Sequence, residues 1–529
     1  MNNSAITAFR PFAGRSAILA LALLWNPGAA SAGSTTVTAV KDGVGPGIPA
    51  SFHLEADQWV RFQAAFAGEP KALWIHGPVS NYQVTTGTPV GCLQLGGPAT
   101  YHIMIEDPKM GPGTYTIRYA PTGNGNSSAD NGCQESHLTG EPHVTTVNGV
   151  RYDFQSAGEF VALRGESGME IQTRQTPLPA LPPVADAHSG LTAGVALNSA
   201  VAARVNDHRV TYQMGPQATA GAAPALELRV DGVPTVLRSD GLALGPGGRL
   251  SPLPDNGIRI DFPDGTTLAV TANLWPAASL WYLNLDVSHT PAHQGIMGTI
   301  ARRNWLPALP DGSELGRRPR SAHQRYVDLY QRFADAWRVT DRTSLFDYER
   351  GTSTATFALA GWPGEAGAVA VAGRAAVPPL GGAAARRACR GIAGRNLRRD
   401  CVFDVRATGD RGFAAGYARV ERVRGGMTAT RLESLPDRGN DAGRAAFAAT
   451  VDRPARSGRA ALAGGVQFTV DGVDSGAPVS LGAGGRASWQ APRLDAGEHR
   501  IGARYIPAAG SAFLPSEGFA IPHVVRPGY

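Results

Sequence analysis

The 529-residue chain has little lysine, few aromatic residues and only four cysteines. Three of its 49 basic residues are lysines and the remaining 46 are arginines, a bias that, with abundant alanine and glycine, is typical of a GC-rich bacterial genome. The positive charges are scattered and are not interleaved with aromatic residues. This pattern argues against a nucleic-acid-binding surface.

Short catalytic motifs are also missing. The chain contains no His-Glu-x-x-His, Gly-x-Ser-x-Gly or Gly-x-x-x-x-Gly-Lys, and no Cys-x-x-Cys that would indicate a zinc ribbon or a redox site. We therefore expect no catalytic residue, no cofactor and no metal ligand. A hydrolase stays an alternative, because a site assembled in space leaves no motif. Its acid–base pair would be His143 and Asp153, although a structural His143 that hydrogen-bonds backbone is the preferred interpretation.

No run of membrane-spanning length follows the first 25 residues. There, two arginines precede an apolar run ending at Trp25, and Ala30-Ser31-Ala32 follows. This arrangement predicts a signal peptide over residues 1–32, cleaved after Ala32, and a secreted or periplasmic protein without a membrane span in the mature chain. Cleavage removes two arginines and no acid, so the net charge falls from +6 to +4.

The cysteines are few but even in number. In an exported protein, Cys92, Cys133, Cys389 and Cys401 predict two disulfides. Local pairing, Cys92 with Cys133 and Cys389 with Cys401, is the most economical of the three possible connectivities.

Short strand-forming runs separated by glycine and proline predict a mainly β, multi-domain chain with β-sandwich-like modules. The predicted boundaries are 1–32 for the signal peptide, 33–136 for a β-sandwich-like N-terminal domain, 137–346 for a central β domain, 347–425 for a small helical, disulfide-containing segment, 426–448 for a polar linker and 449–525 for a C-terminal β domain. Within the helical segment, residues 383–392 and 395–402 are predicted to be short helices.

Three patterns within the central domain predict local structure. Asn148-Gly149 favours a two-residue hairpin turn with positive φ at both residues, between Val144–Val147 and a return strand. The alternation in Trp281–Val287 predicts a strand with one buried and one wet face. In His323–Val339, apolar residues recur at helical spacing, which predicts a helix packed by an aromatic stripe, with Asp328 on its polar side.

The hairpin and two later elements resemble a von Willebrand factor type D domain. Gly140-Glu141-Pro142-His143 stands where that family has Gly-Asp-Pro-His, Gly295-Ile296-Met297-Gly298 is similar to its Gly-Leu-Cys-Gly element, and Phe333–Val339 resembles its closing segment with tryptophan. The resemblance covers 137–346 and implies a type D-like β domain. Its signature residues here are Gly140, Pro142, His143, Asn148, Gly149, Tyr152, Phe154, Gly295, Gly298 and Trp337.

Two departures limit what this resemblance implies. Met297 replaces the central cysteine, so a disulfide-exchange role is not carried over. Two arginines follow the element where animal members have asparagine and aspartate, and Asn148 replaces an acidic turn residue. We therefore expect weak or no calcium binding at that position.

The C-terminal unit resembles bacterial immunoglobulin-like repeats through Val466–Gly472 and Ala496–Tyr505. Such repeats are spacers or adhesive modules, which favours a secreted, non-catalytic adhesive or scaffold protein. Its partner would be an unknown extracellular or envelope protein or glycan. A lipid- or glycan-binding protein is a further alternative, and a lipid site would need a large apolar lining.

Arginines crowd the helical segment. They are Arg386, Arg387, Arg390, Arg395, Arg398 and Arg399. We favour solvated helix faces over a polyanion-binding patch, because aromatic residues and glycine-rich phosphate loops are missing there.

Overall fold

The computed structural model describes residues 134–525 except 166–167, 179–183, 193, 216–224, 246, 276–279, 291, 360, 366–379, 436–444 and 453–460; before residue 134 it describes the backbone of eight strands. The expected signal peptide, residues 1–32, and the expected Cys92–Cys133 disulfide lie outside the described residues. Strands account for 39% of the residues and helices for 19%, which confirms the mainly β fold class.

Eight strands lie within residues 33–136, the range predicted for the N-terminal β domain. They are β1 (Thr35–Lys41), β2 (Ala50–Leu54), β3 (Trp59–Ala65), β4 (Ala72–His76), β5 (Asn81–Thr85), β6 (Gly91–Gln94), β7 (Ala99–Met104) and β8 (Gly113–Pro121). One sheet has the order β1-β8-β3-β6, and β2-β7-β4-β5 form part of a second sheet.

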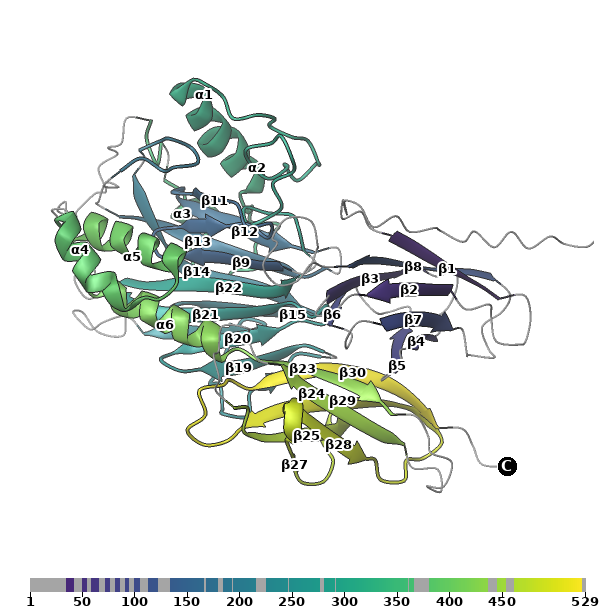
Figure 1. Ribbon diagram of the computed structural model, residues 1–529. Helices are drawn as coiled ribbons and strands as arrows, with labels where there is room; N and C mark the ends of the chain where they lie inside the picture. The colour runs from purple at the N-terminus through teal and green to yellow at the C-terminus, as the bar shows by residue number, and fades with distance from the viewer. Residues whose placement is uncertain are drawn as a thin grey trace, which may run out of the picture.

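The central module consists of two antiparallel sheets (Figure 1). An eight-stranded sheet has the order β11-β10-β9-β22-β21-β20-β19-β18, and a six-stranded sheet has the order β12-β13-β14-β15-β16-β17. Their strands are β9 (Gln134–Thr139), β10 (His143–Thr145), β11 (Arg151–Asp153), β12 (Gly158–Arg164), β13 (Glu170–Leu178), β14 (Val195–Val205), β15 (His208–Met214), β16 (Leu226–Val230), β17 (Val233–Pro234), β18 (Leu242–Ala243), β19 (Arg249–Leu253), β20 (Gly257–Asp261), β21 (Thr267–Trp275) and β22 (Leu280–Thr290). Side chains from both sheets share one hydrophobic core.

The helix expected over 323–339 is present. It runs through α1 (Ala322–Tyr326), a π-helical stretch (η2, Val327–Phe333) and α2 (Ala334–Trp337). Its aromatic stripe is buried in the core shared by the two sheets, as predicted. Asp328, expected on the polar side, is also buried; it accepts hydrogen bonds from Gln324 and Arg332.

A helical segment covers the outer face of the eight-stranded sheet (Figure 1). Its elements are α4 (Gly382–Ala388), a 3-10 turn (η3, Cys389–Gly391), α5 (Arg395–Thr408) and α6 (Phe413–Gly426). The short helix α3 (Thr354–Phe357) instead contacts β12 and β13 of the six-stranded sheet. The expected Cys389–Cys401 disulfide joins η3 to α5 with Cα atoms 6.0 Å apart. The prediction of a wet face on β22 is wrong: Tyr282, Asn284 and Asp286 are buried, because this segment packs over them.

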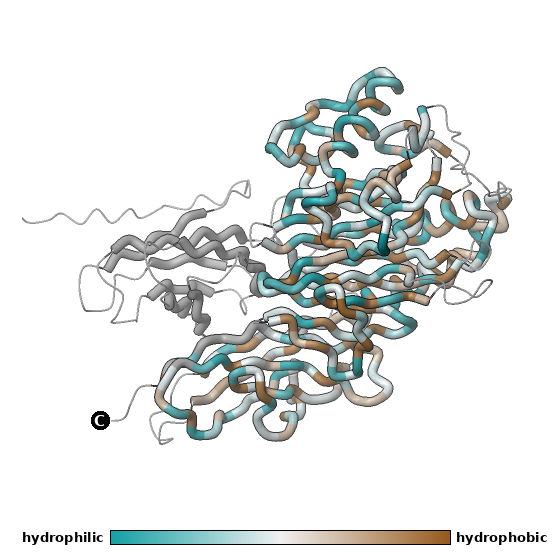
Figure 2. The backbone as a smooth tube through the Cα atoms, turned by 180° about the vertical axis from the view of Figure 1, so that it is seen from behind, coloured by the Kyte–Doolittle hydropathy of each residue, from teal (hydrophilic) through white to brown (hydrophobic). Residues whose placement is uncertain are grey.

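The C-terminal module is a two-layered sandwich. Its strands are β23 (Ala429–Ser434), β24 (Ala446–Asp452), β25 (Gly464–Val470), β26 (Val473–Asp474), β27 (Val479–Ser480), β28 (Arg486–Gln490), β29 (Gly497–Pro507) and β30 (Ser516–Val525), with a 3-10 turn, η4 (Ala483–Gly485), between β27 and β28. The layer β23-β24-β28 shares a core with the layer β26-β25-β29-β30. Figure 2 shows apolar and polar residues alternating along these strands, as a sandwich requires.

The predicted linker over 426–448 is wrong in part, because it contains β23. This strand pairs with β24 along its length, and Leu432 is buried in the sandwich core. Ser434 also pairs with Asn81 of β5, which joins the C-terminal and N-terminal strands in one sheet. The C-terminal module therefore begins near residue 429, twenty residues before the predicted boundary of 449.

The central and C-terminal modules interlock where α6 passes into β23. Arg259 of β20 is almost fully buried and donates to the carbonyl oxygens of Thr428 and Pro515. Leu253 and Val423 share a small apolar cluster beside this contact. No helix in the described part of the chain is long and apolar enough to cross a membrane.

Candidate functional site

The hairpin of β10 and β11 places the first site residues. Strands β10 and β11 pair with His143 opposite Asp153. The turn differs from the expected one: Gly149 N donates to Thr146 O, and of the turn pair only Gly149 has a positive φ, +77°. The turn closed by this hydrogen bond has Val147 and Asn148 at its centre, so the positive φ falls on the glycine that follows them. The Asn148 side chain is held by a distant segment.

That distant segment is the Gly295–Gly298 element. Asn148 Nδ2 donates to Ile300 O at 2.8 Å, and Val147 N donates to Met297 O at 2.9 Å. The Tyr152 hydroxyl donates to Ile296 O. The two elements, far apart in sequence, therefore form one unit.

Both glycines of this element are required by close backbone approach. Gly295 has φ +120°, and a Cβ there would lie 2.6 Å from Ala162 O. A Cβ on Gly298 would lie 2.5 Å from His293 O. Any side chain at either position would move the backbone of the unit.

The closing segment packs on the same unit. Phe154 contacts Phe160 and Phe333 edge to face, with ring centroids 5.1 and 5.9 Å apart. Trp337 is buried and donates from Nε1 to Ala308 O at 3.1 Å. The structure thus brings the three segments of the sequence resemblance into one core, with Phe154 and Trp337 as packing residues.

Gly140 and His143 instead face the helical segment, and Pro142 lies between them at the start of β10. Pro142 O accepts from Phe154 N at 3.0 Å, which fixes the start of β10. Gly140 has φ +59°, and a Cβ there would lie 1.8 Å from Asp404 Oδ2 of α5. Only glycine lets α5 come this close.

His143 lies between two carboxylates. Its Nδ1 is 2.7 Å from Asp153 Oδ1 of β11, and its Nε2 is 2.8 Å from Asp404 Oδ1 of α5, 261 residues away. The expectation that His143 bonds backbone is therefore wrong. Two carboxylate partners favour the imidazolium, in which both ring nitrogens donate.

Further polar groups complete this histidine cluster, which we define as Glu141, His143, Asp153, Asp404 and Tyr417. Asp404 Oδ2 accepts from the Tyr417 hydroxyl at 2.6 Å and from Glu141 N at 3.2 Å. The Glu141 carboxyl is fully buried, and neither oxygen has a hydrogen-bond partner among the described residues. Beside the cluster, Arg151 forms an ion pair with Asp400.

The cluster holds more carboxyls than cations, and this shifts its pKa values. Burial, with the nearby charge of Asp404, raises the pKa of the Glu141 carboxyl well above its usual range. Burial by itself lowers the pKa of His143, but Asp153 and Asp404 overcome it and raise that pKa well above its ordinary value. Burial also raises the pKa of Asp404, although His143 and Tyr417 oppose the shift. Protons are therefore bound more tightly in the folded cluster than in the unfolded chain.

The cluster is poorly placed for catalysis. His143 is 5% exposed and Asp404 is inaccessible. Both ring nitrogens are occupied by carboxylates, so neither can accept a proton from a nucleophile without breaking a buried ion pair. In the described residues, no group of three or more histidine, cysteine, aspartate or glutamate side chains is arranged to hold a metal.

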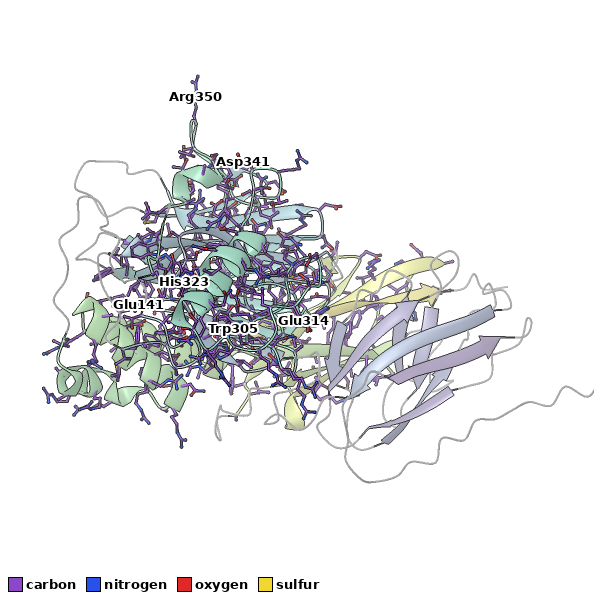
Figure 3. The ribbon with its side chains drawn as sticks, turned by 90° about the horizontal axis from the view of Figure 1, so that it is seen from above. Glu141, Trp305, Glu314, His323, Asp341 and Arg350 are labelled. Atoms are coloured by element: carbon purple, nitrogen blue, oxygen red, sulfur yellow. A yellow bond between two sulfur atoms is a disulfide. The ribbon has the colours of Figure 1, made fainter. Side chains whose placement is uncertain are left out.

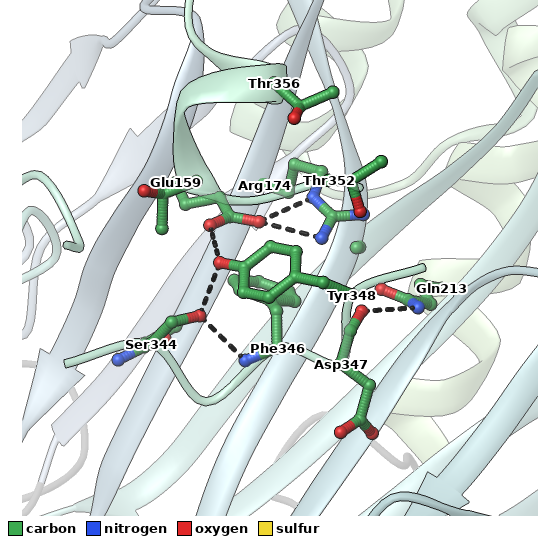
Figure 4. Close-up of polar contacts among 12 residues, drawn as sticks. Glu159, Arg174, Gln213, Ser344, Phe346, Asp347, Tyr348, Thr352 and Thr356 are labelled. Carbon is green, nitrogen blue, oxygen red and sulfur yellow. Dashed lines mark hydrogen bonds and ion pairs between the residues drawn. The ribbon is translucent and has the colours of Figure 1, made fainter. Parts of the chain in front are cut away.

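A second buried ion pair lies on the six-stranded sheet (Figure 4). Arg174 Nε donates to Glu159 at 2.8 Å, and the Tyr348 hydroxyl donates to the other Glu159 oxygen. The guanidinium lies over the rings of Phe346 and Phe357, 4.7 and 3.5 Å from their centroids. This Glu159–Arg174 pair fastens residues 344–357 to β12 and β13.

A surface cavity of about 320 Å³ lies between α6 and the β21–β22 hairpin. Its polar lining includes Asp255, Asn256, Asn273 and Arg419. Arg419 Nε donates to Asp255 at 2.8 Å, and its Nη1 donates to Ala272 O at 3.0 Å. Because these polar side chains share the lining with Leu274, Trp281 and Tyr282, the cavity has no continuous apolar lining for an acyl chain.

Sequence reasoning found His143 and Asp153 but missed Asp404 and Tyr417. Asp404 lies on the buried side of α5, between the buried Cys401 and Val405. An acid on the apolar face of a predicted helix signals a buried partner. The prediction ended that helix at residue 402, so the signal was lost.

The chain matches no protein-family model, and comparison with curated proteins gives no significant match.

Proposed function

We propose that this protein is a secreted, non-catalytic scaffold or adhesin whose β-rich modules hold a fixed arrangement and present outer surfaces to an envelope or extracellular partner. The observation that carries the proposal is the engagement of both His143 ring nitrogens by carboxylates, those of the partly buried Asp153 and the buried Asp404. The best acid–base candidate of the sequence serves to fasten α5 to β10 and β11. An active site would need it exposed.

The module contacts support a rigid scaffold. Arg259 donates to the carbonyl oxygens of Thr428 and Pro515, at the start of the C-terminal module. Only two residues, Met427 and Thr428, connect the end of α6 to the start of β23. Such buried contacts restrict hinge motion more than a flexible linker would. We further propose a type D-like domain for 137–346, supported by the convergence of its signature residues, and an immunoglobulin-like domain for the C-terminal sandwich.

The hydrolase alternative gives the sharpest test. Purified protein and the His143→Gln variant are assayed on esterase, glycosidase and peptidase substrates. The scaffold proposal predicts no turnover above background in either protein. Turnover that His143→Gln abolishes, while the variant keeps its circular dichroism spectrum, would contradict it.

The adhesive part of the proposal needs a binding test. Beads coated with the protein should retain envelope material of the producing organism, and beads coated with an unrelated secreted protein of equal net charge should not. Equal retention by both would remove the support for adhesion. Lipid recovered from the native protein would favour the alternative of a lipid-binding protein. The polar residues that line the α6 cavity do not suit a lipid.

A further inference from the structure

One surface of the helical segment is strongly basic. We define the basic face by six arginines that the structure places at exposed positions on α4, η3 and the first turns of α5: Arg386, Arg387, Arg390, Arg395, Arg398 and Arg399. No aspartate or glutamate occurs between Gly382 and Arg399. Figure 3 shows nitrogen-tipped side chains projecting outward from this segment.

Few of these arginines are neutralised by the protein itself. Arg398 Nη1 donates to Ile392 O at 3.2 Å, and Arg399 Nε lies 3.9 Å from Asp400. Asp400 is already paired with Arg151. The charge of the basic face is therefore directed mainly to solvent.

The backbone beneath the basic face is held firmly. The Cys389–Cys401 disulfide closes the turn between α4 and α5. Glu421 of α6 accepts from the backbone nitrogens of Ala393 and Gly394 at 3.0 and 2.7 Å. A fixed array of guanidinium groups loses less conformational entropy on binding than a flexible basic tail does.

Two guanidinium groups converge at one end of the basic face. A Cβ placed on Gly382 would lie 3.3 Å from Arg386 Nη1 and 3.8 Å from Arg406 Nε. Arg406 Nε is buried and has no hydrogen-bond partner among the described residues. Like charges this close favour an anion between them.

The chemistry of the surface selects the kind of anion. The segment from Gly382 to Arg399 contains no aromatic residue for base stacking, which disfavours single-stranded nucleic acid. Its larger apolar residues, Ile392 and Leu397, are buried, so it has no anchor for a bilayer or for a protein hot spot. What remains is a polymer of repeated oxyanion groups such as carboxylate, sulfate or phosphate, which arginine binds through its forked N–H groups.

We propose that the basic face, which the sequence led us to expect as solvated helix faces, binds an anionic polysaccharide that carries such groups along its length. This deepens the proposed scaffold function by naming its partner class, and rests on it for the extracellular setting. Contacts are multiple and individually weak, so affinity depends on polymer length and falls with salt.

The test uses the full mature protein and polygalacturonate as the probe, with neutral dextran of similar length as its control. The variant Arg386→Gln/Arg387→Gln/Arg390→Gln is compared with Arg302→Gln/Arg317→Gln/Arg342→Gln, which removes the same charge from exposed positions elsewhere. Binding is measured by titration calorimetry at low and at about 0.5 M salt.

We expect polygalacturonate to bind at low salt, dextran not to bind, and the basic-face variant to bind about tenfold more weakly than the control variant. Equal weakening in both variants would overturn the proposal, because it would show only net charge. The proposal would also be overturned if polygalacturonate did not bind at low salt, or if the protein bound anionic vesicles and not the polysaccharide. These outcomes leave the substrate assays of the scaffold proposal untouched, so the two can fail separately.

Discussion

The two buried ionic groups of the central module differ in charge balance. In the Glu159–Arg174 pair, one carboxylate meets one guanidinium, and Tyr348 supplies a further donor. In the histidine cluster, three carboxyls surround one imidazole, and Glu141 has no partner for its side chain among the described residues. The Glu159–Arg174 pair therefore has equal positive and negative charge and lies within one sheet. The histidine cluster has an excess of carboxyls, joins β10 and β11 to α5 and α6, and retains protons.

The difference shows in the direction of the pKa shifts. Burial lowers the pKa of Arg174, and Glu159 opposes that shift, so the guanidinium stays charged at any ordinary pH. In the histidine cluster, the pKa values of Glu141, His143 and Asp404 are all raised. Only the histidine cluster should therefore respond to pH near neutrality.

Replacing His143 should cause the largest loss of stability among the variants that compare the two groups. His143→Leu leaves the buried Asp404 and the partly buried Asp153 without their cation, and we expect the free energy of unfolding to fall by about 3 to 5 kcal/mol. Urea denaturation measures it. The control is His208→Leu, whose partner Asp231 is half exposed, and a loss below about 1 kcal/mol is expected there. Similar small losses in both variants would refute a clamping role for His143.

Replacing the arginine tests the balanced pair. Arg174→Met leaves Glu159 with the Tyr348 hydroxyl as a donor, so the loss should be smaller than for His143→Leu, about 3 kcal/mol. The same denaturation measures it, with the exposed Arg342→Met as control. A larger loss than in His143→Leu would reverse the ranking of the two groups.

The two tyrosines provide a matched pair of smaller changes. Tyr417→Phe removes the donor to Asp404, and Tyr348→Phe removes the donor to Glu159. We expect losses of about 1 to 2 kcal/mol, greater for Tyr417 because Asp404 shares its one cation, His143, with Asp153, whereas Glu159 keeps Arg174. Thermal unfolding of both variants, each compared with the unaltered protein, decides the order. Equal losses would mean that charge balance does not matter here.

The smallest expected effect depends on pH. A carboxyl whose pKa is raised by folding contributes stability that is complete below its unfolded value, 4.5 for Glu141, and is lost as pH rises through the folded value. Glu141→Gln removes this dependence. Between about pH 5 and pH 8, the variant should gain on the order of 1 kcal/mol relative to the unaltered protein.

Denaturation of both proteins across this range measures the difference. An unchanged difference between them would show that Glu141 does not retain its proton. Asp286, whose pKa Arg424 and His137 lower against the effect of burial, should not contribute over the same range.

Local patterns in the sequence predicted much of the fold. The helical spacing of Tyr326, Leu329 and Phe333 correctly predicted a buried stripe. The alternation in Trp281–Val287 correctly predicted a strand, but Asn284 and Asp286 are polar residues buried under α6. Periodicity reports polarity, and it cannot tell which polar face another element will cover.

The missing parts depend on contacts between distant residues. The partner of His143 is Asp404, which lies in a helix predicted to be two residues too short to include it. The strand β23 was missed because most of its side chains are polar; its one threonine, Thr430, is buried and hydrogen-bonds Ser516. Helix α6 contains Gly416, which lowers helix propensity but lets the helix approach Tyr282 and Asn273.

Hydrogen exchange on α5 and α6 in the unaltered protein and in His143→Leu tests the central claim most directly. If His143 fastens these helices to the sheet, amides of 395–426 should exchange faster in the variant while those of β25 and β29 keep their protection. Unchanged protection of 395–426, together with loss of turnover on any substrate, would contradict the account and make His143 a catalytic residue.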